Sequence, residues 1–526
     1  MTLGGAHSGT RPGATTLRAV AGRLILALLL LATGACWVLS SPVASAPDDD
    51  YHLASIYCPM HASGPGCGET VVDGARAVNV PSGILQTECF RFKYTESAAC
   101  TGDLDSSSRV RTTRVDAGAY PYGYYQFNHL LVGPTLFSTT IRVRLANVVL
   151  AVLGLVLVGS TLPTGQRRPF VLAMSIGWMP MGLYFVASTN PSAWALIGVP
   201  LFGACILGAF ASDGRRRAVL LVEAAAFAAM AIFSRTDSKI LCAVVALAAI
   251  LLHLRGRMDR RVLLVAGVLG VAGVVTYLTG GQKVAGLRQA IESSASSTAT
   301  NSLTGPDDSF FVLIAKTMLR FPSYFAGYFG IDGGAMGWLD VTLHPLARYG
   351  PLVLFSALML MGAARPAWSK IVSAGMILAF MLVVPAYYMA VKGLVNDGFF
   401  ESRYLLPLMP FLLFVWMIRA DGRQSDTEEF RLTGLQLGIV IAILAVSQSM
   451  SLHSVLRRFI TGADVEAYNL AASVEWWPYS GFSPNVVWAV ASICFMLALV
   501  LASLLSRSPG VQRSAPGRVS DSAVRH

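Results

Sequence analysis

The chain has 526 residues, of which 54% are hydrophobic and 13% are charged, and its mean hydropathy is +0.58. Soluble globular proteins carry about 25% charged residues, so this chain has roughly half the usual number. The apolar residues lie in long blocks rather than in the stripes of half-buried helices or strands. These features exclude a cytosolic enzyme, a disordered protein and a fibrous repeat, and they predict an all-α integral membrane protein.

The net charge is +11, from 40 Lys and Arg against 29 Asp and Glu. In a soluble chain this excess would suggest a nucleic-acid partner. In a membrane chain the positions of the charges matter more than their sum, because basic residues collect in cytoplasmic loops. We therefore expect no nucleic-acid partner, and we use the excess to orient the chain in a lipid bilayer.

Twelve apolar blocks have roughly the length of a membrane helix, for which about 17 to 25 residues are needed. They lie at 20–40, 145–162, 170–188, 192–211, 218–234, 238–254, 262–279, 350–364, 371–391, 404–418, 433–450 and 485–506. The blocks at 350–364 and 404–418 are short, so the expected number of transmembrane helices is about twelve. These runs lack the alternation of a membrane barrel, and a helix satisfies its own backbone groups in lipid.

The basic residues orient these spans. With the N-terminus placed inside, twenty Lys and Arg flank the inner ends of the spans, whereas the short outer loops hold only Arg235, Lys392 and Arg403. Of the 29 acidic residues, 21 lie in outer segments. We therefore expect a multi-pass protein of the cell membrane with both termini in the cytoplasm.

This topology divides the chain into tails, spans and three long extracytoplasmic loops. The segments are a cytoplasmic tail (1–19), the first span (20–40), the first outer loop (41–144), spans two to seven (145–279), the second outer loop (280–349), spans eight to eleven (350–450), the third outer loop (451–484), the last span (485–506) and a basic cytoplasmic tail (507–526). The first block could instead be a cleaved signal peptide, because Ala44-Ser45-Ala46 resembles a cleavage site. Its apolar run is longer than a usual signal core, which favours a retained span.

Four cysteines, Cys58, Cys67, Cys89 and Cys100, lie in the first outer loop. An even number of cysteines in an exported segment predicts disulfides. Three pairings are possible, and we favour Cys58–Cys67 with Cys89–Cys100 because this pairing closes the shortest loops. A zinc site is less favoured, since no CxxC is present.

Three carboxylates, Asp48, Asp49 and Asp50, follow the first span directly. Adjacent carboxylates raise one another's pKa unless a cation or a hydrogen-bond donor compensates. They could form a solvated acidic turn. Their place at the membrane surface, however, suits catalysis: one carboxylate could take a proton from an acceptor hydroxyl, and Asp48 and Asp50 could hold a divalent cation, Mg²⁺ or Mn²⁺.

The first outer loop ends in a group of tyrosines that includes Tyr124 and Tyr125, and then reaches Arg142 and Arg144. Tyrosines at a membrane boundary are usually interface anchors. They could also stack on a sugar, and the two arginines suit a phosphate group.

Two further arginines lie in outer turns, against the inside bias of basic residues: Arg235 and Arg403. A pairing of Arg403 with Glu401 or a phosphate ligand would each explain its position. Both arginines are therefore candidates for phosphate binding.

Five motifs, in this order, resemble the bacterial membrane family called "domain of unknown function 2142". They are Asp48-Asp49-Asp50-Tyr51-His52, Tyr120–Tyr125 before Arg144-Leu145, Met179-Pro180-Met181 with Ser188-Thr189-Asn190-Pro191, Gly337-Trp338-Leu339-Asp340, and Arg403-Tyr404-Leu405-Leu406-Pro407. The resemblance covers roughly residues 20–420. This family is similar in organisation to the GT-C glycosyltransferases.

The resemblance implies a GT-C-like multi-span architecture with an acidic motif in the first outer loop, and an inverting transfer from a polyprenyl-phosphate-linked sugar to a cell-envelope glycan or protein. Asp49 or Asp50 would act as the base, and Arg403 would lie near the donor phosphate. The candidate substrate-binding residues are His52, Tyr124, Tyr125, Asn190, Trp338 and Asp340.

Three functions are compatible with the sequence: a lipid-linked sugar transferase, a transporter or flippase for lipid-linked sugars, and a non-catalytic envelope-assembly subunit that binds a partner through the 280–349 loop. A transporter would need broken helices in repeated positions or polar residues at the bilayer midplane. The sequence shows no clear internal repeat, so we favour the transferase.

Overall fold

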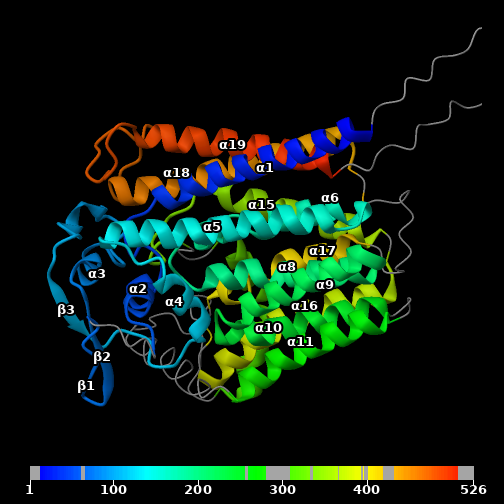
Figure 1. Ribbon diagram of the computed structural model, residues 1–526, viewed down its shortest axis with the longest axis horizontal. Coiled ribbons are helices and arrows are strands. Elements are labelled where there is room, and N and C mark those ends of the chain that lie inside the picture. Colours follow the sequence, from blue (N-terminus) through cyan, green and yellow to red (C-terminus); the bar gives the residue numbers. More distant parts are fainter. Residues whose placement is uncertain are drawn as a thin grey trace, which may run out of the picture.

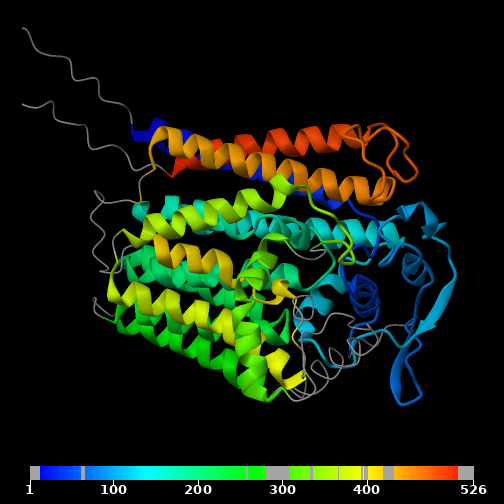
Figure 2. The same cartoon turned by 180° about the vertical axis from the view of Figure 1, so that it is seen from behind.

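The computed structural model is a bundle of long, roughly parallel helices with a small mixed region at one end (Figures 1 and 2). It describes residues 12–60, 66–254, 259–279, 308–331, 336–364, 366–392, 395, 401–418, 430 and 432–506. The described residues leave out 280–307 and 332–335 of the predicted second outer loop and, except for residues 12–19, both predicted tails.

Nine helices of the described residues are long and apolar enough to cross a membrane. They are α1 (Pro12–Leu39), α5 (Leu136–Thr161), α8 (Ser192–Phe210), α10 (Thr236–His253), α11 (Arg260–Thr279), α15 (Pro345–Ala363), α16 (Trp368–Lys392), α18 (Gly434–Ile460) and α19 (Pro484–Leu505). This confirms the predicted class of multi-span helical membrane protein, and α8, buried on all sides, lies at its centre.

Three predicted spans take a different form. For this reason nine helices of the described residues, rather than twelve, are long and apolar enough to cross a membrane. The 170–188 block is divided between α6 (Thr164–Gly177) and α7 (Met181–Val186), because Pro180 does not continue the helix. The 218–234 block is in α9 (Gly214–Ile232), which also carries three arginines. The 404–418 block gives η5 (Ser402–Tyr404) and a ten-residue helix, α17 (Leu408–Met417).

Two helices extend beyond their apolar blocks. α5 begins at Leu136, nine residues before the predicted start, because Thr135 and Ser138 form a capping box. α18 continues ten residues beyond the predicted end at 450, to Ile460. Arg142, Arg144 and Arg458 therefore belong to helices, which the hydropathy pattern could not show because these extensions are polar.

The region between α1 and α5, which we call the cap (residues 40–135), is folded rather than a simple loop. It contains α2 (Asp49–Tyr57), α3 (Gly83–Gln86), η1 (Thr87–Cys89), η2 (Ala98–Thr101), α4 (Tyr122–His129) and the strands β1 (Thr70–Val72), β2 (Ala75–Pro81) and β3 (Arg109–Thr112). The strands form an antiparallel sheet in the order β1-β2-β3, with Val80 opposite Val110. Leu53, Val78 and Ile84 form its small apolar core.

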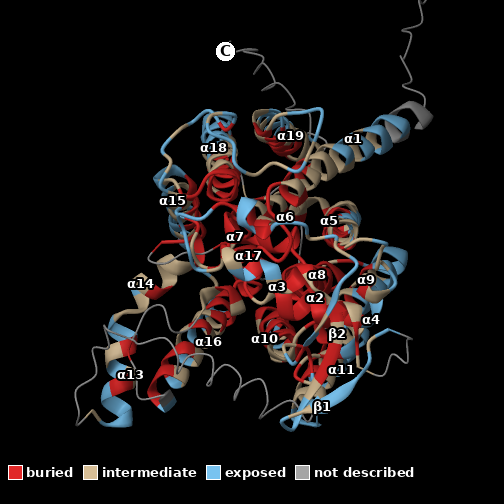
Figure 3. Cartoon of the chain, turned by 90° about the vertical axis from the view of Figure 1, so that its left-hand side faces the viewer, coloured by how far each residue is buried: buried red, intermediate tan, exposed pale blue. Residues whose placement is uncertain are grey.

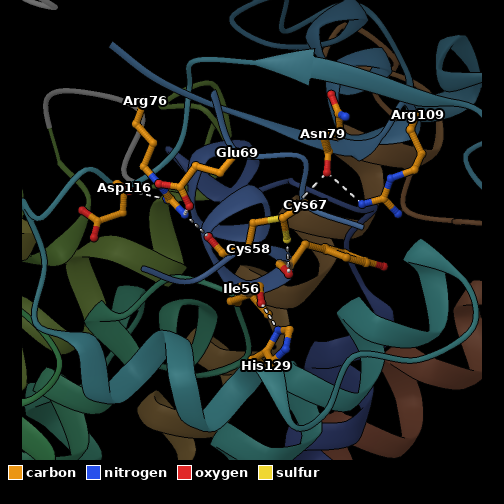
Figure 4. Close-up of a disulfide and its surroundings, with 10 residues drawn as sticks. Ile56, Cys58, Cys67, Glu69, Arg76, Asn79, Arg109, Asp116 and His129 are labelled. Atoms are coloured by element: carbon orange, nitrogen blue, oxygen red, sulfur yellow. Dashed lines mark hydrogen bonds and ion pairs between the residues drawn. A yellow bond between two sulfur atoms is a disulfide. The ribbon is translucent and has the colours of Figure 1, made fainter. Parts of the chain in front are cut away.

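The structure confirms both predicted disulfides, Cys58–Cys67 and Cys89–Cys100. Around the first of them, Arg76 donates hydrogen bonds to the carbonyl oxygens of Cys58 and Asp116, at 3.1 and 2.7 Å (Figure 4). The disulfides and these bonds cross-link loops of the cap, and such cross-links reduce the conformational entropy of the unfolded chain.

Arg458 of α18 ties the cap to the helix bundle. It donates to the carbonyl oxygens of Phe90, Lys93 and Glu96, at 2.5 to 2.9 Å. It also forms a buried ion pair with Asp340, at 2.6 Å. One side chain therefore connects three segments that are far apart in the sequence.

Replacing Arg458 with Leu should destabilise the protein by about 3–5 kcal/mol, because the Asp340 charge and three carbonyl groups would lose their buried partner. The loss is measured as a lower unfolding midpoint of the purified protein and faster proteolysis of the cap. The double variant R458L/D340L should recover part of the loss, because it removes the buried charge. Exposed Arg18 provides the control, R18L, and equal stability of R458L and R18L would contradict the assignment.

Candidate functional site

The three carboxylates lie at the start of α2, at the end of the bundle where the cap meets the helices. Asp48 precedes the helix in the left-handed conformation (φ 61°), and Asp49 and Asp50 occupy its first turn. The helix dipole favours negative charge there. The side chain of Asp48 is 46% exposed, whereas those of Asp49 and Asp50 are buried at 0% and 1%.

Arg114 lies between Asp48 and Asp50. Its Nη2 is 2.8 Å from Asp48 Oδ1 and 3.0 Å from Asp50 Oδ1, and its Nε is 2.5 Å from Asp50 Oδ2. Arg91 adds a second cation at 3.3 Å from Asp50. The pair does not fit a divalent cation as it lies, because Arg114 bridges both carboxylates and occupies their oxygens, and the described residues contain no group of three potential metal ligands.

Asp49 faces the protein interior. Its Oδ2 accepts a hydrogen bond from the Ala46 amide at 3.1 Å and lies 3.9 Å from Arg144. Burial raises the pKa of Asp49 to about 7, although Arg144 and the Ala46 amide act against this rise. A carboxyl group with this pKa is partly protonated at neutral pH.

Arg144 is 1% exposed, and its guanidinium group donates hydrogen bonds to the segment that joins α1 to α2. It donates to the carbonyl oxygens of Val38, Ser41 and Pro42 and to the Ser45 hydroxyl, at 2.6 to 3.3 Å. This pattern assigns Arg144 to positioning the acidic segment. Arg142 is exposed on α5 and forms no hydrogen bond or ion pair with the described residues.

Asp48 lies beside cationic side chains from three parts of the fold, and we refer to this group of residues as the recess. Arg114 follows β3, Arg235 lies in the turn between α9 and α10, and Arg403 belongs to η5. Burial acts to raise the pKa of Asp48, but the charges of Arg114 and Arg403 and the hydrogen bond from Arg114 outweigh it, and the pKa is lowered. Asp48 is therefore ionised at neutral pH.

The two predicted phosphate-binding arginines of this recess share one aromatic partner. The guanidinium carbon of Arg235 lies 4.9 Å from the ring centre of Tyr404, and that of Arg403 lies 5.3 Å from it. Arg235 pairs with Asp237 at 3.0 Å. Arg403 is 9% exposed, and its Nη1 finds no hydrogen-bond acceptor among the described residues. A buried guanidinium with an open donor is suited to an anionic ligand.

His52 lies one turn after Asp48, inside a group of aromatic rings. Its Nδ1 forms a 2.8 Å hydrogen bond with the Tyr125 hydroxyl, and its ring centre lies 5.2 Å from that of Tyr120. Burial lowers the pKa of His52 to about 3, because the arginine charges add to burial and outweigh Asp48. His52 is therefore neutral at physiological pH.

The other predicted substrate-binding residues hold the acidic segment in place. Asn190 donates to the Pro47 carbonyl and Trp338 to the Ala44 carbonyl, each at 2.9 Å. Tyr124 donates to the carbonyl of Thr189, next to Asn190, also at 2.9 Å. Asp340 accepts from the Trp338 amide at 3.0 Å and pairs with Arg458, so these polar groups are already used within the fold.

Sequence reasoning missed one residue of the recess, Arg114. Arg114 lies just after a short basic strand, where nothing in the local pattern distinguishes it from Arg109 or Arg111. Its role depends on pairing β3 with β2, which brings residues 64 to 66 positions apart into contact.

These features define a multi-span helical membrane protein with a disulfide-containing cap and a recessed, arginine-lined carboxylate site. Residues 31–412 match the family described as "Predicted membrane protein (DUF2142)", and the chain belongs to this family. The match extends from the middle of α1 into α17 and includes every residue of the recess. No curated protein and no solved structure matches the chain.

The raised pKa of Asp49 predicts a pH-dependent stability. Between about pH 4 and pH 7 the folded protein holds a proton on Asp49 that the unfolded chain has lost, so the stability should fall as the pH rises through this range. Asp49→Asn, which mimics the protonated carboxyl, should remove this fall and give a higher melting temperature than wild type above pH 7. Thermal unfolding of the purified protein across this pH range measures the effect.

The matched control is Asp73→Asn, an exposed position in the same cap. It should leave the pH profile unchanged. A D49N variant with the same pH dependence as wild type would show that Asp49 is not the titrating group.

Proposed function

We propose that this protein is a membrane glycosyltransferase that moves a sugar from a polyprenyl-phosphate donor to a cell-envelope glycan or protein. The observation that carries the proposal is the buried, open Nη1 donor of Arg403 in the same recess as the partly exposed carboxylate of Asp48. An open guanidinium donor suits the donor phosphate, and an accessible carboxylate suits an acceptor hydroxyl.

In the proposed reaction, the acceptor hydroxyl oxygen attacks the anomeric carbon while the bond from that carbon to the phosphate oxygen breaks. The hydroxyl proton passes to Asp48. The polyprenyl phosphate leaves with the bonding electron pair, and Arg403 and Arg235 stabilise its negative charge. This single displacement inverts the anomeric configuration. The residues supply the positive charge, and no step is assigned to a metal ion.

In this proposal we prefer Asp48 to Asp49 as the base. Asp49 has a pKa of about 7, which suits proton transfer, but its side chain has no exposed surface. Asp48 has the access that a base needs, at 46% exposure. Asp50 is held between Arg114 and Arg91, so we assign it to fixing Arg114 beside Asp48.

The same proposal places the cap on the outer side of the cell membrane, with both termini in the cytoplasm. Two disulfides in the cap fit an oxidising compartment. The excess of basic residues on the opposite side of the predicted spans supports this orientation. The recess then lies beyond the helix ends, at the depth of lipid phosphate groups.

Replacing Asp48 with Asn should lower sugar transfer by about 10²–10⁴-fold, because the reaction loses its general base. The measurement is transfer from a purified polyprenyl-phosphate-linked sugar by the purified protein, together with the envelope glycans of cells that carry only the variant. Asp73→Asn is the matched control and should behave as wild type. Unchanged transfer by D48N at a normal membrane level would overturn the assignment of Asp48.

Replacing Arg403 with Gln should lower transfer on the order of 10²–10³-fold, because the leaving phosphate loses its donor. Arg403→Lys should recover part of the rate, since it keeps the charge but loses the planar fork. In cells, loss of the glycan with donor accumulated on the outer face supports a transferase, whereas donor retained on the inner face would identify a flippase. Unchanged glycans in both Arg403 variants would contradict the phosphate-binding role.

A further inference from the structure

A cavity of about 260 Å³ lies between α1, α5, α6 and α19, away from the recess. Its walls are mainly apolar and include Leu30, Val152, Phe170 and Leu499. α1 and α19 form an outer layer over α5 and α6, so the cavity lies between two layers of the bundle (Figures 1 and 3). Protein interiors are closely packed, so we infer that a space of this size between spans is filled by a bound molecule.

One end of this cavity is cationic. Arg23 of α1 and Arg167 of α6 both line it. Arg167 is fixed by hydrogen bonds from its Nε to the Leu162 carbonyl and from its Nη2 to the Ser160 carbonyl, each at 2.9 Å. Within the described part of the chain, neither arginine forms an ion pair with a carboxylate. The positive charges of Arg23 and Arg216 repel that of Arg167.

The apolar part of the cavity extends most of the way across a membrane. Arg23 and Trp37 both line it and are fourteen residues apart on α1. At 1.5 Å per residue this separation is about 21 Å, compared with about 30 Å for the hydrocarbon core of a bilayer. A cationic end joined to a long apolar body matches a lipid with an anionic headgroup.

We propose that this cavity binds one anionic phospholipid, with its phosphate at Arg23 and Arg167 and one acyl chain between α1, α5 and α19. The position of the cations excludes the donor lipid of the proposed transfer as the occupant. Arg23 lies far from the cap end of α1 at Leu39, whereas the donor phosphate must reach Arg403 beside the cap. The site therefore stands apart from the proposed reaction.

Tryptophan quenching by brominated lipids tests this site, because Trp37 and Trp178 both line the cavity. The full chain is placed in phosphatidylcholine vesicles that contain a small fraction of brominated phosphatidylglycerol or, at the same fraction, brominated phosphatidylcholine. The anionic lipid should quench the fluorescence at least twofold more than the neutral one. The variant W37F/W178F should lose most of this difference in quenching between the two lipids. Such a loss would show that the extra quenching arises from lipid bound in the cavity.

Arg23→Gln should abolish the preference for phosphatidylglycerol, and the matched variant Arg18→Gln, an exposed arginine on the same helix, should retain it. Ala498→Phe, which places a ring in the cavity, should reduce quenching by the brominated phosphatidylglycerol while the protein stays folded by circular dichroism. Equal quenching by the two lipids in wild type, or an equal loss in R23Q and R18Q, would overturn the proposal. Competition by polyprenyl phosphate but not by phosphatidylglycerol would also overturn it.

Discussion

Burial of two carboxylates within a run of three is the constraint on which this structure depends. Two of the three side chains, those of Asp49 and Asp50, are almost completely removed from solvent. Buried charges are tolerated only where cations and hydrogen-bond donors surround them. The fold meets this requirement by bringing Arg114 from the end of β3 and Arg144 from α5 to the start of α2.

The three carboxylates consequently have different environments. Arg114 and Arg91 neutralise Asp50. Burial raises the pKa of Asp49 to about 7, although Arg144 acts against this rise. The arginines of the recess keep Asp48 ionised. Only Asp48 combines charge with access. A short acidic run therefore supplies one charged group that is partly exposed and two that are buried within the surrounding structure.

Buried arginines also connect the cap to the membrane helices. Arg144 and Arg458 bind backbone carbonyl groups of the segments on either side of this boundary and carry almost no exposed surface. A guanidinium group has five donors in a fixed plane, so one side chain can satisfy several carbonyl groups at once. Arg144, whose position near the membrane surface suggested phosphate binding, donates to the segment between α1 and α2 in this way, whereas Arg403 keeps its Nη1 without an acceptor among the described residues.

The sequence by itself determined the helical membrane class, the disulfide pairing and the segment that carries the acidic motif, because these depend on local composition and short spacings. It overestimated the number of long spans among the described residues, since the block around Pro180 is divided between two helices, α9 begins with three arginines, and α17 has only ten residues. Only the tertiary structure decided which arginines meet Asp48. Arg114 and Arg403 reach it through strand pairing and helix packing, and contacts between residues so far apart in the sequence leave no local signal.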